Sequence, residues 1–168
     1  MEKGDRKERV MRWMKDRENW PVIGVVLIAI VIRLYYFSIT HSQPLWWDEA
    51  DYLAYSKNIA NMGSNWIVTV QHNSIFPYIV AGIFALGFSE PAAKFLVEIL
   101  PSVFVVILTY AVVRQMYEDK RVALFSAFLI SVFWNVLFNS MRFHVGVPGL
   151  FFALLAMYVF WKGYENKE

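Results

Sequence analysis

Long apolar runs constrain the fold of this chain more than any other feature. The hydrocarbon core of a membrane, about 30 Å thick, is crossed by a helix of roughly 20 apolar residues. Four runs reach or approach that length, at residues 21–39, 92–113, 122–138 and 145–161. With 58% hydrophobic and 18% aromatic residues, the 168-residue chain is also too apolar for an ordinary soluble domain. We therefore predict an all-α, polytopic membrane protein.

A fifth apolar run, residues 75–88, is shorter than a usual membrane span, so the charges of the flanking loops decide how it is assigned. Lys and Arg prefer the cytoplasmic side of short loops. Residues 1–20 hold seven of them and residues 114–121 hold three, whereas residues 41–91 hold only Lys57. If residues 75–88 crossed, the basic 114–121 loop would lie outside. We therefore predict four transmembrane helices, at about 20–40, 92–114, 121–140 and 145–162, with residues 75–88 as an interfacial or re-entrant helix.

This topology divides the chain into a cytoplasmic basic segment, residues 1–20, and a transmembrane module, residues 21–168, with one long external loop at 41–91. Both termini are expected in the cytoplasm, and the functional site is expected on the extracytoplasmic face, where the long loop lies. The charge rule already explains the basic N-terminus, so we predict the lipid bilayer as its partner and no nucleic acid.

Two carboxylates, Asp48 and Glu49, lie just beyond the first apolar run and follow two tryptophans, Trp46 and Trp47. Tryptophan suits the headgroup level of a membrane. Acidic groups are costly there unless they meet water, a metal or a substrate. We therefore expect chemistry at this doublet and take Asp48 and Glu49 as candidate catalytic residues.

The doublet opens a stretch with helical character, residues 48–62, which Gly63 would end. In the alternative interpretation Asp48 is only the N-cap of that helix. Tyr52 follows Asp48 by one turn, so it would either line the same face or pack onto the membrane surface.

Other charged groups suggest further sites. Glu49 and His72 could hold a divalent ion, or His72 could simply be a satisfied hydrogen-bonding group. The chain has no cysteine, which excludes thiolate metal sites and disulfides. Arg33 lies inside the first span and needs a partner there, for which Glu98 is the candidate.

Arg142 and His144 lie in the turn between the last two predicted helices, on the same side as Asp48. An external Arg could bind a phosphate bidentately. It could equally contact a lipid headgroup or pair with Asp48 or Glu49. We take Arg142 and His144 as candidate substrate-binding residues.

The ordered motifs resemble the N-terminal part of the C-type (GT-C) membrane glycosyltransferases, in the branch of aminoarabinose transferases and protein O-mannosyltransferase-like enzymes. The most specific match is PLWWDE at residues 44–49 with Tyr52. The others are NWIV at 65–68, LGF at 86–88, Arg114 with EDKRVAL at 118–124, and MYVFW at 157–161.

The resemblance implies a polyprenyl-phosphate sugar as donor and transfer on the external face. The residue matching Asp48 would act as the base toward the acceptor. A cation or metal would stabilise the leaving phosphate, and the candidates are Lys57, Arg142 or a metal near Glu49 and His72. Lys57 therefore joins the candidate substrate-binding residues, and so does Tyr52, which belongs to the matching motif. His144 is the nearest substitute for a second acidic residue of the family.

Enzymes of this kind have about three more helices, so we expect the chain to need a second membrane chain or further helices for sugar transfer. Two alternatives stay open: a non-catalytic membrane subunit that scaffolds or regulates another enzyme, and a polyprenyl-lipid-binding protein.

Overall fold

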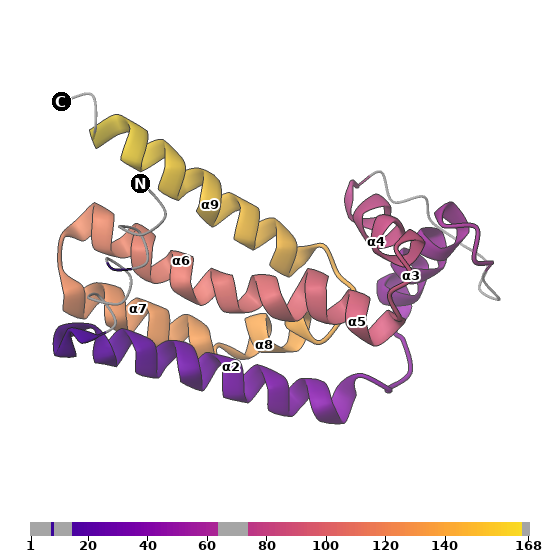
Figure 1. Ribbon diagram of the computed structural model, residues 1–168, viewed down its shortest axis with the longest axis horizontal. Coiled ribbons are helices and arrows are strands. Elements are labelled where there is room, and N and C mark those ends of the chain that lie inside the picture. The colour runs from indigo at the N-terminus through magenta and orange to yellow at the C-terminus, as the bar shows by residue number, and fades with distance from the viewer. Residues whose placement is uncertain (1–7, 9–14, 64–73, 166–168) are drawn as a thin grey trace.

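The computed structural model describes Glu8, residues 15–63 and residues 74–165. Within these ranges the regular elements are all helical (Figure 1). Three helices are long and apolar enough to cross a membrane: Arg17–Thr40, Glu90–Tyr117 and Gly146–Tyr164. The predicted all-α polytopic fold is therefore confirmed, and the chain is an integral membrane protein.

The third predicted span, at 121–140, is not one straight helix. It consists of α7 (Lys120–Val132) and α8 (Trp134–Ser140), which are bent by 52° at Phe133, whose backbone is extended. The pair would make a fourth span only if the two helices together cross the membrane. Neither glycine nor proline lies in this stretch, so the residues that usually announce a bend gave no warning of it.

The other spans match their predicted positions. α2 (Trp20–Thr40) is the first. The second is a continuous helix made of α5 (Glu90–Lys94), a π-helical turn η2 (Phe95–Ile99) and α6 (Leu100–Tyr117). α9 (Gly146–Glu165) is the last. In the π turn the N–H of Leu100 donates to the carbonyl of Phe95, and Pro101, which has no N–H to offer, follows at once.

Small residues let the long helices pack closely. α6 contacts α7 and α9, and α2 contacts α7. Ala29 of α2 and Ala127 of α7 are buried with Val25 and Val106 in one apolar cluster. Small side chains at such crossings allow the close van der Waals contact that holds membrane helices together.

Arg33 is fully buried among these helices, and its partners correct our expectation of a pair with Glu98. Its Nε donates to Ser102 Oγ at 2.8 Å, and its Nη1 donates to the carbonyls of Ala29 at 3.2 Å and Ser131 at 3.1 Å. The Ser131 carbonyl lies in the last turn of α7, next to the bend, where intrahelical partners run out. Arg33 therefore supplies a hydrogen bond to a backbone carbonyl next to the bend.

Two shorter helices, α3 (Trp47–Ile59) and α4 (Phe76–Ala85), lie beyond one end of the long helices (Figure 1). They share an apolar cluster with the start of the second span. The cluster includes Tyr52, Phe76, Val80, Ala93 and Phe143. The predicted 48–62 helix is thus present, but it ends at Ile59. Its N-cap is Trp46, without a side-chain bond, so the N-cap interpretation of Asp48 is wrong.

The start of α2, the α6–α7 turn and the end of α9 gather at the opposite end from α3 and α4 (Figure 1). The basic residues Arg17, Lys120 and Lys162 belong to that end. This is the separation that the charge argument requires. Which end faces the cytoplasm stays a prediction.

Candidate active site

The first turn of α3 turns its two adjacent carboxylates in different directions. Asp48 is exposed, whereas Glu49 is buried with only 4% of its surface accessible. Successive helical residues are about 100° apart around the axis, so neighbours rarely share an environment. Trp47, just before them, has a φ of 37°, a left-handed value that is strained for a bulky residue.

The Glu49 carboxylate accepts three hydrogen bonds. Lys94 Nζ donates to Oε1 at 2.9 Å, the backbone N–H of Phe143 donates to the same oxygen at 3.1 Å, and Arg142 Nη1 donates to Oε2 at 3.2 Å. These donors come from α5 and from the α8–α9 loop, residues 141–145. Glu49 therefore ties α3 to the other two segments. Of the two carboxylates considered as partners for Arg142, Glu49 rather than Asp48 forms the pair. Phosphate binding by Arg142 stays a prediction.

Aromatic rings hold both cations in place. The guanidinium of Arg142 lies 4.6 Å from the Trp46 ring centroid and 5.0 Å from that of Phe138, and Lys94 Nζ lies 5.1 Å from that of Phe143. Such contacts add attraction to the ion pairs and keep the flat guanidinium in one plane.

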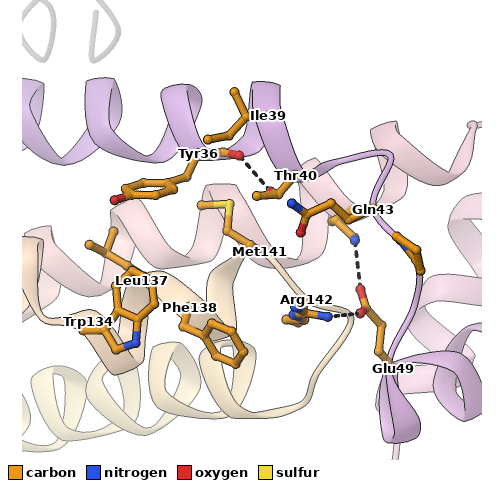
Figure 2. A pocket seen from close by; sticks show the side chains of 12 residues that line it. Tyr36, Ile39, Thr40, Gln43, Glu49, Trp134, Leu137, Phe138, Met141 and Arg142 are labelled. Atoms are coloured by element: carbon orange, nitrogen blue, oxygen red, sulfur yellow. Dashed lines mark hydrogen bonds and ion pairs between the residues drawn. The ribbon is translucent and has the colours of Figure 1, made fainter.

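A cavity of about 290 Å³, here called the inner pocket, opens beside this cluster (Figure 2). Its apolar wall includes Tyr36, Ile39, Trp134, Leu137, Phe138 and Met141. Its polar end is formed by Gln43, Glu49, Lys94 and Arg142. Two cations against one carboxylate leave that end with a net charge of +1, so the pocket suits an anionic group attached to an apolar body.

A second cavity of about 350 Å³, the outer pocket, also has Arg142 in its lining. It is lined by Trp46, Trp47, Asp48, Glu49, Phe138, Asn139, Arg142 and His144. The two pockets share Glu49, Phe138 and Arg142. A phosphate held by Arg142 would therefore lie within reach of a group bound next to Asp48.

A second buried carboxylate holds the same loop. Glu98, in the π-helical turn, accepts the backbone N–H of His144 at 2.9 Å. Since Glu49 accepts the N–H of Phe143, two carboxylates from different elements catch consecutive backbone groups of the loop. This fixes the positions of Arg142 and His144 relative to α3.

Two predicted substrate-binding residues lie elsewhere. Tyr52 is buried against Phe76, with ring centroids 5.4 Å apart, and Lys57 is paired with Glu90. Burial raises the pKa of the Tyr52 phenol, and the charge of Asp48 raises it further. Neither residue lines the inner or the outer pocket, so their contact with substrate stays a prediction.

The metal site also stays a prediction, because His72 lies outside the described residues. Both oxygens of Glu49 are bonded to cations, and a divalent ion would have to compete with Lys94 and Arg142. Among the residues that the structure describes, no group of three His, Cys, Asp or Glu is placed to hold a metal ion.

Sequence reasoning missed the role of Lys94. Lys94 is a charge near the start of the second span, where it is buried and bonded to Glu49. One feature of the sequence could have identified this role: a cation inside an apolar run needs an acidic partner. Trp134 and Gln43 gave no signal, since their place in the inner pocket depends on the bend and on the α2–α3 loop.

A family model described as dolichyl-phosphate-mannose-protein mannosyltransferase matches residues 71–168. The chain belongs to this family. The resemblance to GT-C membrane glycosyltransferases is thereby confirmed, and the chain is assigned to the membrane glycosyltransferases. The match includes Lys94, Glu98, Arg142 and His144, while Asp48 precedes it. Comparisons with curated proteins and with solved structures gave no match.

Proposed function

We propose that this mannosyltransferase-family chain transfers a sugar from a polyprenyl-phosphate donor to an acceptor hydroxyl on the extracytoplasmic face. The observation that carries the proposal is that Arg142 lines both the cationic, apolar-walled inner pocket and the outer pocket that contains Asp48. The family description, which names a dolichyl-phosphate donor and a protein acceptor, supports the same assignment.

The inner pocket suits the donor. A polyprenyl phosphate joins a single anionic headgroup to a long apolar chain, and the pocket joins Lys94 and Arg142 to a wall of aromatic and aliphatic side chains. Arginine and lysine stabilise phosphate oxygens through charge-assisted hydrogen bonds. In the donor complex Arg142 would share its N–H groups between Glu49 and the phosphate, since the guanidinium has five N–H bonds to give.

The outer pocket suits the acceptor. The Asp48 carboxylate takes the proton of the acceptor hydroxyl as the oxygen forms a bond to the anomeric carbon of the sugar. The bond from that carbon to the phosphate oxygen breaks, and its electron pair leaves with the polyprenyl phosphate. Lys94 and Arg142 stabilise the negative charge that grows on the leaving group.

A complete enzyme, in this proposal, includes further helices or a second membrane chain, as the resemblance implies. Of an 18-residue apolar window in the last span, Gly146–Tyr164, only 11% is buried inside the structure. Most of this span is therefore left for lipid or for such additional helices to cover. Purification from native membranes, followed by identification of any membrane protein that comes with the chain, tests this part.

The test of function uses membranes containing the full chain, radiolabelled dolichyl-phosphate mannose and a threonine-containing peptide. Asp48→Asn removes the base and should lower transfer at least about a hundredfold, the usual lower limit for general base catalysis. Asp119→Asn is the matched control: Asp119 caps α7 at the opposite end of the molecule, and Asn is as good a cap. Transfer unchanged in Asp48→Asn would reject the assignment and favour a scaffold or lipid-binding role.

A further inference from the structure

His144 is held from three directions at the edge of the outer pocket. Its backbone N–H donates to Glu98 at 2.9 Å. Its ring packs edge-on against Tyr52, with centroids 6.2 Å apart. Its side chain also meets the first residue of α9, where the N–H of Gly146 donates to His144 Nδ1 at 3.1 Å. The ring is thus fixed in position by groups on α3, η2 and α9.

The bond from Gly146 decides which ring nitrogen carries the proton. A backbone N–H can only donate, so Nδ1 must offer a lone pair and cannot itself be protonated. In a neutral imidazole the proton then lies on Nε2. No hydrogen bond to Nε2 is formed within the part of the chain that the structure describes, and this is the nitrogen left for a ligand.

The glycine at 146 is what lets the ring approach the helix end. A Cβ atom added there would lie 3.0 Å from His144 Nδ1 and 3.4 Å from Cε1. Gly149, one turn further along α9, has no atom within 4 Å of its added Cβ. A Cβ at 146 would therefore require the imidazole to shift by a few tenths of an ångström, whereas position 149 has room for one.

We propose that α9 locks His144 as the Nε2–H tautomer, and that this N–H is a hydrogen-bond donor to an oxygen atom of the acceptor substrate. The proposal rests on the proposed function, in which the acceptor occupies the outer pocket. Asp48 and His144 line that pocket together. Asp48 accepts the hydroxyl proton, and His144 Nε2 donates to another oxygen of the same molecule, which orients the hydroxyl toward the base.

The tautomer is measured without any need for activity. The chain contains three histidines, His41, His72 and His144, so ¹⁵N-histidine labelling of the protein in lipid nanodiscs gives few ring signals. The His144 signals are those missing in His144→Asn. We expect a protonated Nε2 and an unprotonated Nδ1, with the Nε2 signal shifting when the threonine-containing peptide is added. A protonated Nδ1, or an Nε2 signal that the peptide leaves unmoved, would overturn the proposal.

Two substitutions separate the donor role from the contact with α9. In His144→Asn the side-chain oxygen can still accept the N–H two residues ahead, as in an Asx-turn, but the distal donor is lost. In His144→Gln the longer side chain returns an N–H near the Nε2 position and loses the contact with Gly146. We expect the KM for the peptide to rise about tenfold in His144→Asn, as the loss of one hydrogen bond predicts, and to stay close to the wild-type value in His144→Gln. The reverse order would show that the contact with α9 is all that matters.

The glycine pair provides an independent check. Gly146→Ala should displace the His144 ring signals and raise the KM for the peptide, whereas Gly149→Ala should change neither. If wild-type protein in native membranes, together with any membrane protein that comes with it, transfers no sugar, the proposed function fails. The tautomer and the peptide-induced shift still decide the present proposal in that case.

Discussion

Replacing Glu49 by Gln should destabilise the protein strongly, because it removes the carboxylate that Lys94 and Arg142 share. The Gln side chain keeps one acceptor oxygen but places an amide N–H₂ where the other oxygen accepted a bond. Of the three donors on Glu49, two are cationic. One of them, Lys94, is nearly as buried as Glu49 itself, with a side chain 5% exposed. The substitution therefore leaves a buried ammonium without its counter-charge.

The magnitude follows from burial. Breaking a buried ion pair by removing one partner costs about 3–5 kcal/mol, because the remaining charge stays buried without its partner. The matched control is Glu90→Gln, which breaks the pair with Lys57 on the same face of the protein. Those side chains are 24% and 44% exposed, and partly exposed pairs are worth about 0–1 kcal/mol.

Unfolding of the detergent-solubilised protein, followed by helical circular dichroism across a denaturant series, measures both variants. Glu49→Gln should lower the unfolding free energy by several-fold more than Glu90→Gln. The double variant Glu49→Gln/Lys94→Met should recover part of the loss, because it also removes the stranded cation. A Glu49→Gln protein no less stable than Glu90→Gln, or a double variant less stable than Glu49→Gln alone, would refute the buried-triad reasoning.

Three other outcomes follow from the structure. Arg33→Met should lower thermal stability in detergent by the cost of leaving the Ser131 carbonyl unbonded, about 1–3 kcal/mol, and an unchanged melting temperature would contradict the role of Arg33 at the bend. A cysteine introduced at Met62 should react with a membrane-impermeant reagent in intact cells, whereas one at Glu118 should react only after the membrane is opened; the opposite result would reverse the topology. Leu137→Trp should fill the inner pocket and raise the KM for the lipid donor while leaving that for the peptide near its wild-type value, and an unchanged donor KM would place the lipid elsewhere.

The spans could be predicted because membrane crossing depends on composition and length alone. The run at 21–39 became α2, and the weak run at 75–88 became α4, away from the bundle. Charge also separated the two ends of the molecule, since the start of α2, the α6–α7 turn and the end of α9 lie at the end opposite α3 and α4 (Figure 1). These inferences needed no knowledge of which residues touch one another.

Contacts between distant segments could not be predicted in the same way. Arg33 was expected to pair with Glu98, the one acidic group inside the next span, but it bonds instead to carbonyls and a serine. The bend at Phe133 created that opportunity by leaving the Ser131 carbonyl in an end turn. Because no local residue marks the bend, the sequence could not indicate that a backbone group needed the arginine.

The acidic doublet shows why a motif locates a site better than it assigns roles. Two adjacent residues at the start of a helix point about 100° apart. One of them can therefore be buried against the other helices while its neighbour is exposed beside the outer pocket. The motif alone does not say which is which. Burial assigns Glu49 to holding Lys94, Arg142 and the α8–α9 loop. It leaves Asp48 exposed, as its proposed role in proton transfer requires. In the proposed mechanism, Glu49 holds Arg142, a residue that the two pockets share, and Asp48 takes the proton beside it. Exchanging them, as Asp48→Glu with Glu49→Asp, should cost both stability and transfer, since the shorter buried side chain would no longer reach its three donors.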